Sequence, residues 1–176
     1  MKNSQKKKAS QGQVEKKSLK PVLRFLGIFL GIIALFYLIV AVSDDKYFET
    51  YLTITAHIGS FFINIFGGNT SAAGPVISSY DTSMVLSFGC EGTEPIVILL
   101  AGLFAIPISL KKKWLPMIVS SVFLYLLNFL RIVILFYIQK YNTAEFDVYH
   151  TVYFPIIFIL LSVVLLGVSI KWSAKR

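Results

Sequence analysis

The sequence contains only one cysteine and two histidines in 176 residues, and only 15% of its residues are charged. A single cysteine excludes an internal disulfide framework and any cysteine-based zinc site. The two histidines, His57 and His150, lack a cysteine or carboxylate cluster at ligand spacing, so no metal site is expected. Gly67-Gly68 lacks the following lysine and helix start of a phosphate-binding loop, so no nucleotide or other cofactor is expected either.

Apolar residues are abundant instead: they form 56% of the chain, and the mean hydropathy is +0.72. A soluble domain of this length is about half apolar and about a quarter charged. The composition therefore excludes an ordinary cytosolic enzyme, and it excludes disorder beyond the first twenty residues. We expect residues 1–20 to form a disordered basic tail and residues 21–176 to form a single transmembrane domain.

Four long apolar stretches predict membrane-spanning helices, since a bilayer core of about 30 Å needs roughly 20 helical residues. The stretches are approximately Val22–Val42, Ile96–Leu110, Trp114–Ile138 and Val152–Ile170. The second is short and needs a few flanking residues to reach across. The first exceeds the apolar length of a signal peptide, which favours an uncleaved anchor, although Ala41-Val42-Ser43 resembles a cleavage site.

The charges are distributed unevenly between these spans. If the N-terminus is cytoplasmic, the inner segments (1–24, 111–113 and 171–176) hold fourteen of the 17 lysines and arginines, and eight of the 9 acids lie on the outer side. The positive-inside rule then predicts a multi-pass protein of the cell inner or plasma membrane with both termini cytoplasmic. The net charge of +8 reflects this topology and contact with anionic lipid. No nucleic-acid partner is expected, because no basic face alternates with exposed aromatic residues.

Residues 51–66 form a fifth apolar stretch, and every later span would invert if this stretch crossed the membrane. Thr53, His57, Ser60 and Asn64 fall on one face of a helix. A thin polar stripe on an otherwise apolar helix favours a segment that lies in the outer interface or re-enters the bundle. A true span with an internally packed stripe is the alternative.

A short β element is predicted between this helix and the cysteine. Gly67-Gly68-Asn69 breaks the helix. Side chains then alternate with a period of two over Ser83–Phe88, which suggests a strand paired with Val76–Tyr80 in a hairpin. The predicted fold is therefore all-α: a polytopic helical membrane bundle of about four transmembrane helices, with an outer interfacial or re-entrant helix and a short β element.

Three residues are candidates for a reaction site. Cys90 lies in Gly89-Cys90-Glu91-Gly92, and the ionisable Glu91 beside it indicates a polar, hydrated site. The alternative is a small buried hydrophobic residue, which is what most lone cysteines are. Arg131 lies inside the third apolar stretch, where an arginine costs about 2.5–3.5 kcal/mol and usually has a function. The alternative for Arg131 is a side chain that snorkels to the interface. His150 begins the last span, where a lone histidine is often only an interfacial anchor.

The predicted topology places all three on the outer side of the membrane. A thiolate attacks carbonyl groups, and a nearby cation or base lowers the pKa of a thiol from about 8.5. His150 could accept the thiol proton and return it to a leaving amine, and Arg131 could stabilise the thiolate or an oxyanion. Asn128, on the same helical face as Arg131, and Glu91, beside the thiol, are supporting candidates. His57 reaches the same side and is the competing base.

The pattern of these residues resembles the exosortase/archaeosortase family. Gly89-Cys90-Glu91-Gly92, a helix, a basic loop, Asn128-x-x-Arg131 and a later His150 are most similar to the short exosortases, of the exosortase H kind, over about residues 85–172. The resemblance implies a membrane-embedded cysteine transpeptidase, with the cysteine as nucleophile, the arginine as electrophilic partner and the histidine as acid and base. Residues 1–75 share little with the family, and many members have Ser-Gly after the cysteine.

The resemblance also implies partners. Substrates would be secreted proteins with a C-terminal tag made of a short motif, a transmembrane helix and a basic cluster. The tag would be cleaved at the outer face through a thioester, and the protein would pass to an unknown acceptor. Two alternatives stay open: an intramembrane-type cysteine protease with water as acceptor, and a non-enzymatic assembly or transport subunit in which Cys90 is incidental.

Overall fold

The computed structural model describes residues 19–43, 45–87 and 89–175, and helices dominate them. A three-stranded antiparallel sheet, a π-helix and six α-helices make up the fold of these residues. In chain order they are α2 (Lys20–Val42), α3 (Asp45–Ile65), β1 (Ser71–Ala73), β2 (Val76–Ser78), β3 (Ser83–Val85), α4 (Thr93–Ala105), α5 (Leu110–Tyr141), α6 (Thr143–Val148), η1 (Tyr149–Tyr153) and α7 (Phe154–Lys175).

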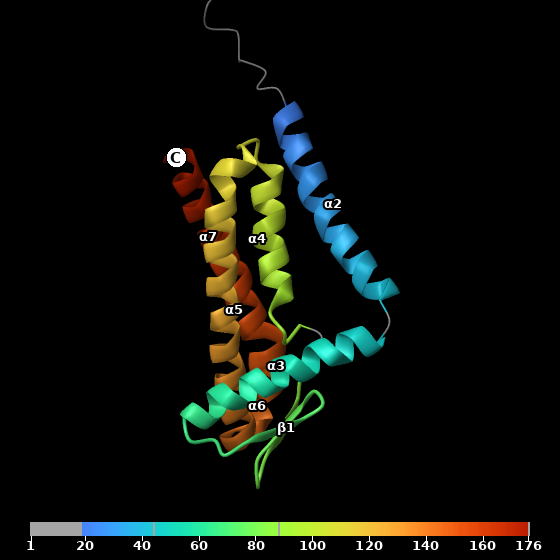
Figure 1. The fold of residues 1–176 in the computed structure, drawn as a ribbon, viewed down its shortest axis with the longest axis vertical. Coiled ribbons are helices and arrows are strands. Elements are labelled where there is room, and N and C mark those ends of the chain that lie inside the picture. The colour runs from blue at the N-terminus through green and yellow to red at the C-terminus, as the bar shows by residue number, and fades with distance from the viewer. Residues whose placement is uncertain (1–18, 44, 88, 176) are drawn as a thin grey trace, which may run out of the picture.

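Helices α4, α5 and α7 form the centre of the bundle, and α2 packs along α4 (Figure 1). The start of α2, the connection between α4 and α5 and the end of α7 lie at one end of the bundle, and the sheet lies at the other (Figure 1). Within the described residues, three helical segments are long and apolar enough to cross a membrane: Lys20–Val42, Leu110–Tyr141 and Thr143–Lys175. The expected helical membrane bundle is therefore confirmed.

Helix α4 is the short member of the bundle, as the sequence predicts, but it does not reach Leu110. It ends at Ala105, and Ile106 adopts an extended conformation with φ −84° and ψ 135°. The reason is Pro107, since the residue before a proline is driven out of the helical region.

Small polar residues hold the three central helices together. The Ser162 hydroxyl on α7 donates to the Pro95 carbonyl on α4 at 3.0 Å, and the hydroxyls of Ser120 on α5 and Ser169 on α7 lie 2.9 Å apart. In apolar surroundings such bonds fix the relative positions of helices that hydrophobicity alone would leave free to slide. Helix α7 is thereby fixed against α4 and α5.

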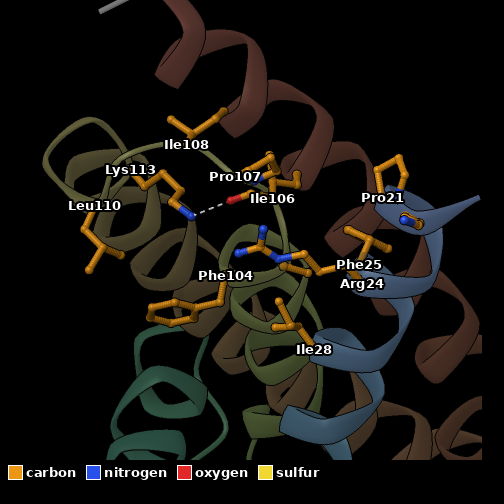
Figure 2. A pocket seen from close by; sticks show the side chains of 12 residues that line it. Pro21, Arg24, Phe25, Ile28, Phe104, Ile106, Pro107, Ile108, Leu110 and Lys113 are labelled. Carbon is orange, nitrogen blue, oxygen red and sulfur yellow. Dashed lines mark hydrogen bonds between the residues drawn. The ribbon is translucent and has the colours of Figure 1, made fainter. Parts of the chain in front are cut away.

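The first turn of α5 differs from the expected basic loop. Residues 111–113 are helical, and Lys113 is buried. Its ammonium donates to the carbonyls of Leu103 at 2.7 Å and Ile106 at 2.9 Å and thereby caps the end of α4. Figure 2 shows the bond to Ile106. The sequence hides this role, because a lysine beside two exposed lysines looks like one more surface charge. The acidic residues Glu145 and Asp147, which precede His150, lie in the helix α6.

Helix α3 runs across α5 instead of alongside it (Figure 1). This orientation agrees with the predicted interfacial helix and not with a span. Part of its polar stripe faces the chain that follows: the Asn64 side-chain amide donates to the Thr70 carbonyl at 2.9 Å, and the Ser60 hydroxyl donates to the same carbonyl at 3.1 Å. The stripe therefore anchors the start of the sheet to α3.

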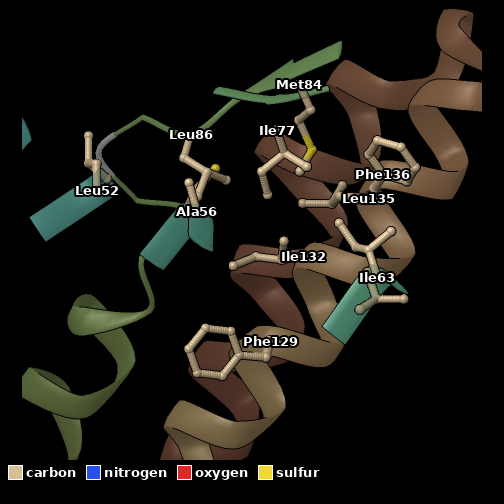
Figure 3. Packing of buried hydrophobic residues seen from close by; sticks show 12 residues of the cluster. Leu52, Ala56, Ile63, Ile77, Met84, Leu86, Phe129, Ile132, Leu135 and Phe136 are labelled. Atoms are coloured by element: carbon tan, nitrogen blue, oxygen red, sulfur yellow. The ribbon is translucent and has the colours of Figure 1, made fainter. Parts of the chain in front are cut away.

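The sheet covers the side of α5 next to α3 with one apolar face. The β2–β3 hairpin expected from the sequence is present, with Ile77 opposite Met84, and both side chains are buried. Strand β1 was not expected; it pairs with β2 so that Ala72 lies opposite Ile77. Figure 3 shows the resulting core, in which residues of α3, the sheet and α5 interdigitate. Cys90 belongs to this same cluster.

The predicted domain division places its basic tail at residues 1–20. Residues 1–18 lie outside the described residues, and Lys20 is already the first residue of α2.

Candidate active site

Cys90 lies on a tight turn that connects β3 to α4. The glycines on both sides of it, Gly89 and Gly92, have φ of +90° and +79°, which is the left-handed region that glycine adopts without steric cost. The Cys90 amide donates to the Ser87 carbonyl at 3.0 Å and closes the turn. The turn directs the thiol inward, and Cys90 is 4% exposed.

Two residues of α5 bind the backbone of this turn. The side-chain amide of Asn128 donates to the Cys90 carbonyl at 2.9 Å, and a terminal guanidinium nitrogen of Arg131 donates to the Gly89 carbonyl at 2.8 Å. Asn128 and Arg131 are one turn apart on the same face of α5. These two bonds fix the position of the cysteine turn relative to α5.

Arg131 faces the protein interior. Its exposed fraction is 5%, and the guanidinium carbon lies 5.7 Å from the ring centres of both Phe154 and Phe158 on α7. Aromatic faces stabilise a guanidinium at this separation. The alternative of a side chain that snorkels to the surface does not describe this geometry, because the side chain bonds to the cysteine turn.

His150 comes to the thiol from the π-helix η1. The Nε2 atom of His150 and the Sγ atom of Cys90 lie 2.5 Å apart in a direct hydrogen-bond contact. The imidazole stacks on Phe146 of α6, with ring centres 5.6 Å apart and an angle of 6° between the ring planes. One extra residue in a π-turn rotates the following side chains, and such turns occur often at functional sites. Here the π-turn holds the residue that contacts the thiol.

The structure separates the two histidines. His57 is exposed on α3, whereas His150 is the histidine in contact with the thiol. The residues brought together are Cys90, Arg131, His150 and Asn128, from the turn, α5 and η1.

Glu91 is completely buried, which differs from the hydrated site expected from the sequence. One of its carboxylate oxygens accepts a hydrogen bond from Thr93 at 2.8 Å, and its backbone carbonyl accepts one from Tyr51 at 3.5 Å. The other carboxylate oxygen has no hydrogen-bond partner among the described residues, and the same holds for Asn128 Oδ1 and Arg131 Nε. Buried polar atoms next to the thiol thus retain bonding capacity.

Two opposing effects act on the thiol. Burial raises the pKa of Cys90 above its ordinary value, and the positive charge of Arg131 partly offsets this increase. The net pKa is raised, so the thiol is protonated at neutral pH. Nucleophilic attack therefore requires a base in contact with the sulfur, and His150 is in that position.

The fold and this site define a helical membrane bundle in which a buried cysteine contacts a half-buried histidine, with a buried arginine on the neighbouring helix. The family model described as "Transmembrane exosortase (Exosortase_EpsH)" matches residues 18–167. The chain belongs to the transmembrane exosortase family. The match includes α2, α3 and the sheet, so the expectation that residues 1–75 share little with the family is wrong for residues 18–75. No curated protein and no solved structure matches the chain.

Replacement of Gly92 by alanine is expected to destabilise the protein. A Cβ atom at this position would lie 2.6 Å from Cγ of the buried Asn128, and φ is +79°. The left-handed conformation costs an L-residue about 1–2 kcal/mol, and overpacking costs typically about 1–3 kcal/mol more. We expect Gly92→Ala to lower the thermal unfolding temperature of the purified protein by about 5 °C or more.

Gly74→Ala is the matched control for this substitution. Gly74 also has a positive φ, of +59°. Beyond its chain neighbours, no atom of the residues that the structure describes lies within 4 Å of the position that a Cβ would occupy, so only the backbone cost applies. A smaller decrease in unfolding temperature is expected for Gly74→Ala. Equal decreases would contradict close packing between the cysteine turn and Asn128.

Proposed function

We propose that the protein is a membrane-embedded cysteine transpeptidase that removes C-terminal sorting tags from secreted proteins. The observation that carries the proposal is the direct contact between Cys90 Sγ and His150 Nε2, next to a buried arginine. Membership of the transmembrane exosortase family supports the same function, because the family is linked to the processing of sorting signals.

The reaction begins with transfer of the thiol proton from Cys90 to His150. The thiolate attacks the carbonyl carbon of the scissile peptide, and the electron pair of the C=O bond moves to its oxygen. When this tetrahedral intermediate collapses, the C–N bond breaks and His150 returns the proton to the leaving amine. The products are a thioester on Cys90 and the released tag.

Arg131 stabilises the negative charge of the intermediate. One guanidinium N–H is already bonded to the Gly89 carbonyl, and the Nε–H has no partner among the described residues. A fixed cation in a site of low dielectric stabilises a developing oxyanion more than water does. Asn128 supports the reaction indirectly, because it holds the Cys90 carbonyl and hence the turn.

The second step resolves the thioester. An acceptor nucleophile attacks the thioester carbonyl, the C–S bond breaks, and the thiol of Cys90 is restored. An amine or hydroxyl acceptor gives a protein with a new C-terminal adduct, whereas water gives a free carboxylate. We assign the reaction to the outer face of the membrane, where secreted proteins with a motif, a transmembrane helix and a basic cluster would present their tags.

The proposal is tested by co-expression of the protein with a tagged secreted protein from the same genome. The C-terminus of the secreted protein is read by mass spectrometry after co-expression with wild type or with Cys90→Ser. We expect the wild type to remove the tag and Cys90→Ser to leave it in place. The processed protein should have a higher mass than the same protein with a free C-terminal carboxylate. A free carboxylate would indicate a plain cysteine protease, and equal removal by both proteins would contradict the nucleophile assignment.

A further inference from the structure

A cavity lies at the opposite end of the bundle from the cysteine. Its volume is about 560 Å³, and the first turns of α2, the end of α4 and the connection to α5 line it. Figure 2 shows Arg24 extending from α2 toward this connection, near Lys113 and Phe104. None of the proposed active-site residues lines it. The cavity is therefore separate from the peptidase chemistry.

Among the described residues, the charged side chains that line the cavity are all cations. Lys20 and Arg24 come from α2 and Lys113 comes from α5. Lys20 and Arg24 are exposed, and neither forms an ion pair with another described residue. Two cations on α2 are thus available to an anionic ligand.

Lys113 removes the main electrostatic obstacle to an anion. The end of a helix carries a partial negative charge from its unpaired carbonyls. At the end of α4 the ammonium of Lys113 binds the carbonyls of Leu103 and Ile106, so this charge is neutralised where it faces the cavity. The cavity retains the net positive charge of Lys20 and Arg24.

The remaining walls are apolar. The apolar lining residues come from α2 (Phe25 and Ile28), from the end of α4 and the residue after it (Phe104 and Ile106), and from the start of α5 (Leu110). A small hydrated anion would gain nothing from such walls. A ligand that joins an anionic group to a hydrocarbon chain would match both the cations and the apolar surface.

We propose that this cavity binds an anionic phospholipid, with the headgroup phosphate between Arg24 and Lys20 and the start of an acyl chain along Phe25 and Phe104. Basic pockets between transmembrane helices are known to hold anionic headgroups. The lipid would also fill a gap in the packing, because α2 has no fully buried residue and its contacts are mainly with α4. The site joins α2 to the bundle through a bound lipid.

The test uses the purified full-length protein in detergent, with phosphatidylglycerol or phosphatidylcholine added, and counts bound lipids by native mass spectrometry. Wild type is expected to retain phosphatidylglycerol in preference to phosphatidylcholine. Arg24→Gln is expected to weaken phosphatidylglycerol binding by about fivefold, from the attraction of one cation near a membrane surface. Lys20→Gln provides a second variant, and Arg24→Lys is expected to restore most of the binding.

Lys112→Gln is the matched control, because Lys112 is exposed at the same end of the bundle and does not line the cavity. It should change binding by less than about twofold. An equal loss for Arg24→Gln and Lys112→Gln would show only general surface attraction and would overturn the proposal. Displacement of the lipid by millimolar inorganic phosphate would indicate a soluble anion as the ligand, and equal retention of both lipids would exclude recognition of charge.

Discussion

His150→Ala is expected to lower tag removal by at least about a thousandfold, while His57→Ala leaves it within about twofold of wild type. A positioned general acid–base group contributes roughly a hundredfold to ten-thousandfold. Here the base must also generate the nucleophile, because burial raises the pKa of the Cys90 thiol and keeps it protonated. His57 is exposed on α3, so its loss does not change the proton acceptor of the thiol. The measurement is the rate of tag removal for each variant at equal membrane abundance.

His150→Gln is the control for packing in this experiment. Alanine removes the ring that stacks on Phe146, so activity could fall because η1 shifts. Glutamine keeps a side chain of similar length and polarity but does not accept a proton at neutral pH. Loss of activity in both variants, with normal membrane insertion, assigns the loss to proton transfer. Full activity of His150→Ala together with loss in His57→Ala would mean that the base has been misassigned.

The spans were predictable because a membrane-crossing helix needs only one feature, an apolar run of roughly 20 residues. Uninterrupted apolar runs identified α2, α5 and α7 to within a few residues, and the period of two after Ser83 identified the β2–β3 hairpin. Strand β1 was missed, since Ser71–Ala73 consists of small residues without alternation and is placed by Thr70 and its bonds to α3. Lys113 was misread for a related reason: its partners are backbone carbonyls, which carry no sequence pattern.

The composition of the site was predictable, but its environment was not. The rarity of cysteine and histidine, and the cost of an arginine within a span, singled out Cys90, Arg131 and His150. Their contacts depend on the π-turn at η1 and on two left-handed glycines, which a sequence pattern does not specify. The complete burial of Glu91 differs from the prediction, because a charged residue between Cys90 and a glycine in a turn indicates a hydrated site.

Arg131→Gln is expected to make Cys90 less reactive and to reduce tag removal by about a hundredfold or more. The positive charge of Arg131 lowers the pKa of the Cys90 thiol against the effect of burial. Without the charge the pKa rises further, so less thiolate is present at any given pH. An opposite charge close to an ionisable group typically shifts its pKa by about one unit or more, which corresponds to about tenfold slower alkylation near neutral pH.

Alkylation by iodoacetamide measures this effect directly, because Cys90 is the only cysteine in the chain. The rate should increase with pH through the pKa of the thiol, and the increase should occur at higher pH in Arg131→Gln than in wild type. Arg131→Lys keeps the charge and should keep the alkylation profile close to that of wild type. Its tag removal should still fall, because an ammonium cannot hold the Gly89 carbonyl and an oxyanion with the fixed geometry of a guanidinium. An unchanged alkylation profile in Arg131→Gln would show that the charge of Arg131 does not affect the pKa of the thiol. Arg131 would then have only a structural role in the turn.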